Sequence, residues 1–423
     1  MHYGESLDYL YGLQRFGIKL GLENIKNLLD ALHHPEKAYS VIHVAGTNGK
    51  GSVSAALAEI LRQAGYKTGL YTSPHLHSFT ERIQVDRCPI SEADVCALTE
   101  EIRAFSSSVP ATFFEFTTAL ALLYFSRQKV DFAILETGMG GRLDATNAVT
   151  PQLTLITPVS LDHVEHLGGD LASIAGEKAG ILKEGVPVVI GSQDDSALEV
   201  LLSRAGQKNC PTWVAGVDYT VIPRGGRFTF AAQGICLENV KPALPGRHQM
   251  HNMGQALAGA LALREQGVAL PEEALRRGVE SVRWPGRLEW WGGGNFLLLD
   301  GAHNAAGAEV LAEYLISLRP AGIRWVFGMK AGRNPADLLS PLLPLVKEVY
   351  CAPPPVEEAV AVQDLCEAVA RHDVPCSAWL SPEEALAAAL AQRTPEEIVL
   401  VAGSLYLVAA AREYLQQQDE KGL

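Results

Sequence analysis

The stretch from His43 to Ser52 reads His-Val-Ala-Gly-Thr-Asn-Gly-Lys-Gly-Ser and has the residue types of a phosphate-binding loop. The run from Val41 to Ala45, which leads into this stretch, is apolar and β-branched, as is typical of a buried parallel strand. The residues after it, Ser52 to Ala64, have helical periodicity. Backbone N–H groups at a helix N-terminus can hold phosphate, and the ammonium of Lys50 adds positive charge. The predicted phosphate site consists of Gly46, Thr47, Asn48, Gly49, Lys50, Gly51 and Ser52.

The match to the usual P-loop pattern is partial. That pattern has Gly at the position of Val44 and Ser or Thr directly after the lysine, whereas here Gly51 follows Lys50 and Ser52 comes one place later. The alternative is a tight strand-to-helix turn with a surface lysine. The order of strand, glycines, lysine and helix favours the phosphate loop.

Polar side chains also follow other predicted strands. Glu136 ends one apolar run, Ser73 follows another and His163 lies beyond a third. Ligands of parallel sheets bind beyond the carboxyl ends of the strands, so we expect these residues and Gly46 to share one site. A carboxylate such as Glu136 can hold Mg²⁺ against phosphate oxygens. The alternative is a helix-capping or surface glutamate.

The residues alone leave the roles of His163 and Lys178 open. Imidazole suits borderline metals better than Mg²⁺, which prefers oxygen ligands, so a structural role for His163 is an equal alternative. Lys178 lies in the sequence Gly-Glu-Lys-Ala-Gly and reads by itself as an ordinary helical lysine. Neither residue is therefore assigned to chemistry from its local pattern.

A second group of polar residues lies in the C-terminal third of the chain. Asp300 ends a predicted strand in the sequence Asp-Gly-Ala-His-Asn, so a carboxylate and the imidazole of His303 lie close together. An aspartate at a strand end can bind a ribose hydroxyl, although it can also cap the following helix. Arg287, beside a predicted linker, could reach phosphate or form a structural ion pair.

Strands and helices alternate over most of the chain, which predicts an α/β fold with a parallel, doubly wound sheet. Short alternating segments with glycines between Tyr219 and Glu238 suggest a small antiparallel patch. Trp284-Pro-Gly is the best linker candidate, and a smaller, Rossmann-like α/β unit follows it. We expect one domain over residues 1–283, a linker over 284–287 and a second domain over 288–423.

Composition narrows the class of protein. The chain has 423 residues, 48% of them hydrophobic and 20% charged, which fits two or three globular domains. A net charge of −13 without basic runs argues against nucleic acid as the main partner. An odd number of cysteines without Cys-x-x-Cys disfavours a disulfide framework or a zinc site and favours reduced thiols in the cytoplasm. No signal peptide or membrane helix is expected.

Ordered motifs over nearly the whole chain resemble those of the folylpolyglutamate synthases, which are often bifunctional with dihydrofolate synthase and belong to the Mur ligase group. The phosphate loop is the first of these motifs. The others are Ser-Pro-His-Leu (73–76), Glu-Arg-Ile (81–83), Gly-Gly-Arg-Leu-Asp-Ala-Thr-Asn (140–147), Leu-Asp-His (161–163), Gly-Glu-Lys-Ala-Gly-Ile (176–181), Pro-Gly-Arg (285–287) and Asp-Gly-Ala-His-Asn (300–304).

The resemblance implies an ATP-dependent ligase that adds L-glutamate to a folate or dihydropteroate carboxylate through an acyl phosphate. It implies that Lys50 and the loop hold the β- and γ-phosphates. It also implies two Mg²⁺ ions, one bound by Ser73 and Glu136 and a second by Glu136, His163 and Lys178. Lys178 would then be carbamylated, because an ammonium beside a cation is repelled.

The same resemblance assigns the remaining site residues. It implies that Asn252, Arg287 and Asp300 contact ATP from the second domain and that His303 and Ser404 hold the incoming glutamate. Other residues are candidates for binding the pteroyl substrate: Asp144, Phe113 and Arg82, with Phe113 and Phe114 alternatively filling a core.

Two rival functions remain to be weighed. A Mur ligase acting on a UDP-linked peptide usually carries an extra N-terminal domain, for which the loop at residue 46 leaves no room. A nucleotide-hydrolysing switch would leave the second domain and the pair His163 and Lys178 unused. We therefore expect a cytoplasmic, monomeric folate ligase with small-molecule substrates and neither nucleic-acid nor membrane partners.

Overall fold

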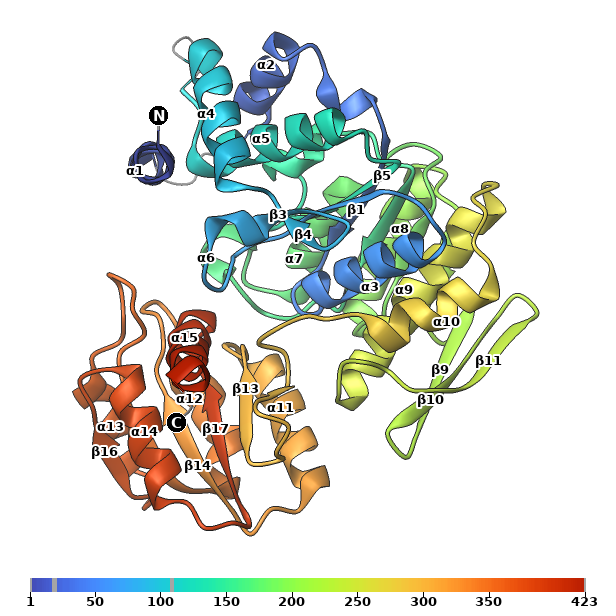
Figure 1. The fold of residues 1–423 in the computed structure, drawn as a ribbon. Coiled ribbons are helices and arrows are strands. Elements are labelled where there is room, and N and C mark those ends of the chain that lie inside the picture. Colours follow the sequence, from blue (N-terminus) through green and yellow to red (C-terminus); the bar gives the residue numbers. More distant parts are fainter. Residues whose placement is uncertain (1, 17–20, 107–109, 422–423) are drawn as a thin grey trace. The chain divides into compact units, whose positions relative to one another are not determined.

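The computed structural model describes residues 2–16, 21–106 and 110–421 (Figure 1). The chain forms two compact units, which are described separately. The first comprises the chain up to Ala243 together with Gln249–Arg283, and the second comprises Leu244–His248 and the chain from Trp284 onward.

The first unit is built on a mixed sheet whose central strands are parallel. The strands run in the order β4-β3-β2-β5-β1-β6-β7-β8. Strand β3 pairs antiparallel with both β2 and β4, and the other neighbouring strands pair in parallel. Their bounds are β1 (Ser40–Ala45), β2 (Thr68–Tyr71), β3 (Ile83–Val85), β4 (Cys88–Pro89), β5 (Phe132–Glu136), β6 (Leu153–Ile156), β7 (Val188–Ile190) and β8 (Thr212–Val214).

Helices cover both faces of this sheet, so its central strands are buried on both sides and read as apolar runs. On one face, Leu153 and Leu155 of β6 lie against Gly259 of α9, where Leu57 of α3 also packs. The helices are α1 (Tyr3–Gly12), α2 (Glu23–Ala31), α3 (Lys50–Gln63), α4 (Glu92–Ser106), α5 (Phe113–Gln128), α6 (Val164–Leu167), α7 (Leu171–Lys178), α8 (Asp195–Gln207), α9 (Arg247–Glu265) and α10 (Glu272–Ser281).

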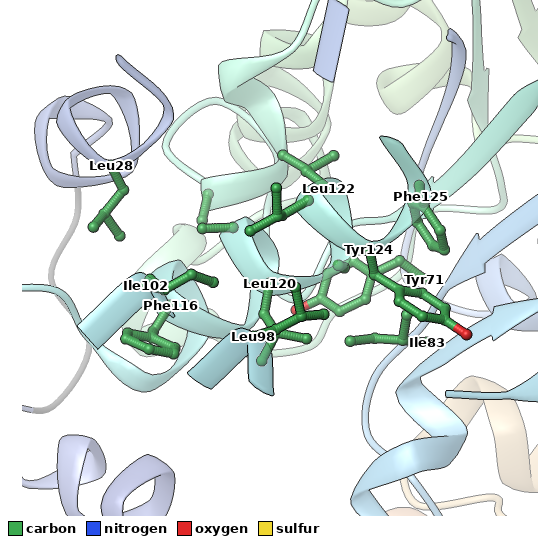
Figure 2. Packing of buried hydrophobic residues seen from close by; sticks show 14 of the residues in the cluster. Leu28, Tyr71, Ile83, Leu98, Ile102, Phe116, Leu120, Leu122, Tyr124 and Phe125 are labelled. Carbon is green, nitrogen blue, oxygen red and sulfur yellow. The ribbon is translucent and has the colours of Figure 1, made fainter. Parts of the chain in front are cut away.

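The core on the other face joins the sheet to α2, α4 and α5 (Figure 2). Tyr71 of β2 and Ile83 of β3 pack there against apolar side chains of α5 such as Phe116 and Leu120, and all four are fully buried. Because interiors are close-packed, this core fixes the sheet relative to α5 and hence positions the strand ends that carry the polar residues.

A small antiparallel sheet of β9 (Tyr219–Arg224), β10 (Arg227–Ala232) and β11 (Ile235–Val240) follows the main sheet in the chain. It matches the antiparallel patch that the alternating sequence predicts. The buried side chains Phe228 and Phe230 alternate along β10 with less buried neighbours, as expected for a sheet covered on one face.

The second unit has its own sheet, in the order β12-β13-β17-β14-β15-β16, with β12 antiparallel to β13 and the other pairs parallel. The elements of this unit are β12 (Glu289–Trp290), β13 (Leu297–Asp300), α11 (Ala305–Leu318), β14 (Gly322–Phe327), α12 (Ala336–Leu342), β15 (Val346–Cys351), α13 (Val362–Ala370), β16 (Cys376–Ala378), α14 (Pro382–Gln392), β17 (Glu397–Ala402) and α15 (Leu405–Lys421).

The predicted α/β class is confirmed, and the predicted apolar strands lie in the two main sheets. The helix after the phosphate loop begins at Lys50 rather than at Ser52. Among the helices of the described residues, none combines the length and hydrophobicity needed to span a bilayer.

Candidate active site

The predicted phosphate loop connects the end of β1 to the start of α3. Gly46 has φ +147° and Gly49 has φ +88°, a backbone region that favours glycine. A Cβ on Gly46 would lie 1.8 Å from the Thr157 hydroxyl oxygen, and one on Gly49 would lie 2.6 Å from Oδ1 of Asn252. These glycines therefore allow a close approach of the backbone as well as the turn.

The loop is tied to the segment that follows the neighbouring strand β6. The amide of Thr47 donates to the Pro158 carbonyl at 3.0 Å, and its hydroxyl donates to the Ser160 carbonyl at 3.0 Å. The amide of Ser160 donates back to the Thr47 hydroxyl at 3.1 Å. These bonds fix the loop conformation before any ligand binds, which lowers the entropic cost of binding.

Two lysines converge on the first residue of the loop. Nζ of Lys50 donates to the carbonyls of Gly46 and Thr47 at 3.3 and 3.1 Å. Nζ of Lys178, on α7, donates to the same Gly46 carbonyl at 2.7 Å. Lys178 is 3% exposed, and its burial, together with the nearby Lys50 charge, lowers its pKa to about 7. The structure therefore places the Lys178 amine at the predicted phosphate loop.

Glu136 lies beside the loop because β5 and β1 are neighbours in the sheet. In their parallel register Glu136 is opposite Val44, two residues before Gly46. The side chain is 6% exposed, and its carboxylate accepts a hydrogen bond of 3.4 Å from the amide of Ser73. A buried carboxylate beside Ser73 and the predicted phosphate loop offers the oxygen ligands that Mg²⁺ prefers.

His163 occupies a tight turn and is less enclosed than Glu136. It has φ +51° and precedes α6, and 47% of its side chain is exposed. Its Nε2 lies 3.9 Å from a carboxylate oxygen of Asp162. An accessible imidazole can ligate a metal through its neutral form, so its position past the end of β6 is compatible with the predicted role.

Asn252 lies in a different domain from the one that the family resemblance led us to expect. The resemblance implies a contact from the second domain, whereas Asn252 belongs to the first unit, on α9. Its Nδ2 donates to Oε1 of Gln249 at 3.0 Å, and its side chain lies against Gly49. The long helix α9 returns to the phosphate loop, and sequence spacing gives no signal for this return.

Asp144 is buried and held by several donors. The amide of Met139 donates to one carboxylate oxygen at 2.9 Å, and the amide and hydroxyl of Thr146 donate to the other at 3.0 and 2.5 Å. Burial nevertheless raises the pKa of Asp144. The Thr146 hydroxyl also lies 2.7 Å from Nε2 of His43, a residue at the start of the first motif to which sequence reasoning gave no separate role.

Arg82 and Phe113 form a small polar-aromatic cluster with His75. Nε of Arg82 donates to Nδ1 of His75 at 2.8 Å, and the guanidinium lies 5.3 Å from the centre of the Phe113 ring. Burial and the Arg82 charge lower the pKa of His75 to about 4, which keeps its imidazole neutral. Phe114 lies against Gly138, where an added Cβ would be 2.5 Å from its ring, and both Phe113 and Phe114 are partly buried and pack against the core.

In the second unit, Asp300 lies buried at the end of β13. Its carboxylate accepts hydrogen bonds of 2.8 Å from the amides of Leu288 and Ala302. It does not cap the following helix, because Asn304 takes that position and accepts from the Gly307 amide at 2.8 Å. Burial raises the pKa of Asp300.

Arg287 and Gly301 are close neighbours beside Asp300. Arg287 donates to the Gly286 carbonyl at 3.3 Å, and a Cβ on Gly301 would lie 2.0 Å from its Nη1. The charge of Arg287 opposes the effect of burial on the pKa of Asp300. The structure thus brings the two predicted residues together within this unit.

His303 and Ser404 follow adjacent strands, since Asp300 of β13 is opposite Ala402 of β17. Nδ1 of His303 is 2.8 Å from the Gly301 carbonyl, which can only accept, so this nitrogen carries the proton. Ser404 is 4% exposed, and its hydroxyl accepts from the Tyr406 amide at 3.2 Å. Arg333, to which sequence reasoning gave no role, donates to the His303 backbone carbonyl at 2.7 Å.

The fold and the site define a ligase of the Mur class. Residues 44–260 match the Mur ligase middle domain, and residues 293–412 match the dihydrofolate synthetase C-terminal domain. These two matches cover the phosphate loop with its surrounding strands and the sheet that carries Asp300.

Relatives of known function narrow the class. The dihydrofolate synthase/folylpolyglutamate synthase of Bacillus subtilis is 36% identical over 98% of this chain and 99% of its own length. The structure of Escherichia coli FolC in complex with DHPP and ADP has a TM-score of 0.92, 32% identity and 99% coverage of both chains. A Mycobacterium tuberculosis folylpolyglutamate synthase complexed with ADP and AMPPCP has a TM-score of 0.89 at 32% identity, covering 97% of this chain and 98% of its own.

The chain belongs to the dihydrofolate synthase/folylpolyglutamate synthase family. It is therefore an ATP-dependent acid–amino-acid ligase, and the resemblance drawn from the sequence motifs is confirmed. The comparisons favour the folate branch over the cell-wall Mur ligases and over a nucleotide-hydrolysing switch.

Proposed function

We propose that this chain uses ATP to join the amine of L-glutamate to a carboxylate of dihydropteroate and of reduced folates, through an acyl phosphate. The observation that carries the proposal is the register that sets Glu136 opposite Val44, beside the phosphate loop. In addition, relatives similar over their full length have both synthase activities in their names.

In this proposal the phosphate loop binds the phosphates of ATP, and residues at the strand ends bind the metal. We propose that the loop from Gly46 to Ser52 holds the β- and γ-phosphates, with Lys50 neutralising charge and Asn252 fixing Gly49 from behind. Ser73 and Glu136 would hold one Mg²⁺, and Glu136 and His163 would contribute to a second. When bound, Mg²⁺ lowers the cost of the charge that develops on the transferring phosphoryl group. Arg287 and Asp300 would bind other parts of the nucleotide.

We further propose that Lys178 is carbamylated and completes a second metal site. Because burial and the Lys50 charge lower the pKa of Lys178 to about 7, part of the amine is neutral at neutral pH and can attack CO₂. The new N–C bond forms with loss of a proton to solvent and leaves an anionic carbamate. That change turns a cation, which repels a metal, into an oxygen ligand.

The organic substrates are assigned from the remaining polar and aromatic residues. Phe113 has a partly exposed ring beside the Arg82 guanidinium, a pair suited to an aromatic substrate with an acidic part. Asp144 would bind the pterin through its buried carboxylate, which the amides of Met139 and Thr146 hold in place. His303 and Ser404 would hold glutamate. We propose a monomer that works in the cytoplasm, in keeping with its seven free cysteines.

The test is an assay of ATP consumption and product mass with dihydropteroate or tetrahydrofolate, each with and without glutamate. We expect ATP turnover only when the pteroyl substrate and glutamate are both present, with one new amide for each ATP consumed. ATP turnover without either acceptor would support a nucleotide-hydrolysing switch. Amide formation with a UDP-linked peptide alone would support the cell-wall ligase.

A further inference from the structure

Three cysteine side chains converge at one edge of the second unit's sheet. Cys351 is the last residue of β15, Cys376 is the first residue of β16, and Cys366 lies on α13 between them in the chain. Sγ of Cys376 is 3.0 Å from Sγ of Cys366 and 3.5 Å from Sγ of Cys351, and all three sulfurs lie within 4.8 Å of one another. None of them belongs to the ligase site described above.

The fold, rather than sequence spacing, creates this cluster. Strands β15 and β16 pair in parallel with Val349 opposite Cys376, and α13 connects them. A crossover helix packs back onto its own pair of strands, so a cysteine on its inner side can meet both strands. No two of these cysteines are close in sequence, so they form no Cys-x-x-Cys motif by which the sequence could reveal the cluster.

The chemistry of the three sulfurs suits a cation. Cys351 is fully buried, and hydrogen bonding to Cys376 together with burial raises its pKa. Hydrogen bonds with Cys351 and then Cys366 lower the pKa of Cys376 to about 7, against the effect of burial. Thiolate is the form that binds metal, so each of the three thiols must lose its proton when an ion binds.

The distances also fit a metal centre. Zn²⁺ binds thiolate at about 2.3 Å, which in a tetrahedron sets the sulfurs about 3.8 Å apart. The two shorter separations here, 3.0 and 3.5 Å, need to open by less than ~1 Å to reach that value. Cys366 and Cys376 are only partly buried, so an ion has a path from solvent.

We propose that Cys351, Cys366 and Cys376 form a three-thiolate site for one thiophilic metal ion, with Zn²⁺ as the ion that fits. As each sulfur–metal bond forms, its thiol proton passes to solvent, and a water molecule takes the fourth position. The ion would tie the edge strand β16 and helix α13 to β15 and so stabilise the open edge of this sheet.

The test uses the full chain, reduced and stripped with a chelator, then titrated with Zn²⁺ or with Co²⁺ as a spectroscopic probe. We expect one tightly bound ion per chain by native mass spectrometry, proton release on binding and a sulfur-to-cobalt charge-transfer band. Cys366→Ser and Cys376→Ser, both at partly buried positions, should each weaken binding at least ~100-fold, in line with the loss of a direct metal ligand.

A matched control keeps the cluster and removes the other cysteines. Replacing Cys88, Cys96, Cys210 and Cys236 with Ser or Ala should leave one bound ion and the same cobalt band. The proposal is overturned if the reduced wild-type chain or this control binds no ion. It is also overturned if the three cysteines respond only to mild peroxide, by forming a disulfide. Because the control leaves the cluster intact, a folding defect in the single variants does not obscure the result.

Discussion

The ammonium of Lys178, on α7, and the carbonyl of Gly46, the first residue of the phosphate loop, lie 2.7 Å apart. This bond brings a buried amine to the same carbonyl that Lys50 contacts. The positive charge of Lys50, together with burial, makes the Lys178 amine easier to deprotonate. A lysine with an ordinary sequence context thus contacts the predicted phosphate loop, as the family resemblance led us to expect.

Removing either the loop lysine or the strand-end carboxylate should stop ligation without unfolding the chain. We expect Lys50→Ala and Glu136→Gln each to lower kcat/KM at least ~100-fold, a usual cost of removing a group that stabilises transition-state charge. Steady-state kinetics and circular dichroism measure the two effects. The exposed residues Lys37 and Glu199 supply the controls Lys37→Ala and Glu199→Gln, which should keep activity. Near-normal turnover in either site variant would show that the site is misplaced.

If Lys178 acts as a carbamate, its loss should be repaired by a small acid. Lys178→Ala removes the anionic ligand and leaves space, so we expect activity to fall at least ~100-fold and to recover in part with added acetate or formate. Wild-type activity should also depend on dissolved CO₂ after the enzyme is stripped at acidic pH. The same rate in bicarbonate-free buffer, with no rescue by acids, would contradict carbamylation.

The effect of the contact between Gly49 and Asn252 can be measured separately from the effect of the positive φ angle of Gly49. Gly49 has φ +88° and Gly65 has φ +92°, but only at Gly49 would a Cβ meet a neighbour within 4 Å. Alanine at either position should cost about 1 kcal/mol or more of unfolding free energy from the backbone alone. We expect only Gly49→Ala to weaken the binding of an ATP analogue, by at least ~10-fold in calorimetry, because it displaces Asn252. Equal affinities for the two variants would contradict this reasoning.

Burial of His43 should make the chain lose stability in acid. Burial, with the nearby Lys183 charge, lowers its pKa from 6.5 to about 3. Between these values the unfolded chain binds a proton that the folded chain does not. The unfolding free energy should therefore fall as the pH falls from 6.5 toward 3, by up to about 1.4 kcal/mol per pH unit. In His43→Gln, which cannot protonate but can still bond Thr146, urea denaturation should show a shallower slope. If the unfolding free energies of the wild type and His43→Gln fall with pH at the same slope, His43 is not the group responsible.

Much of the fold follows from local patterns in the sequence. The apolar runs that became β1, β2, β5 and β6 are buried on both faces, so their hydrophobicity is nearly continuous and easy to recognise. Glu136 stands out because it is a carboxylate at the end of such a run. Short strands such as β8 and β16 were missed, since three residues carry too little periodicity to be distinguished from a loop.

The relations that depend on tertiary structure were not accessible from spacing. The return of α9 to Gly49 placed Asn252 in the first unit, and the crossover through α13 brought Cys366 to Cys376. The pKa of Lys178 depends on burial and on Lys50, neither of which a local pattern records. Apart from Glu136, the metal ligands and the substrate contacts were assigned from the family resemblance, and all of these assignments remain predictions.

The most direct test of the account is a crystal structure of the full chain with a non-hydrolysable ATP analogue and Mn²⁺, whose anomalous signal locates the metal. We predict that the triphosphate lies against the loop from Gly46 to Ser52, with Lys50 on its phosphates and a manganese peak at the carboxylate of Glu136. A triphosphate bound away from Lys50, or manganese that does not contact Glu136, would contradict the central claim.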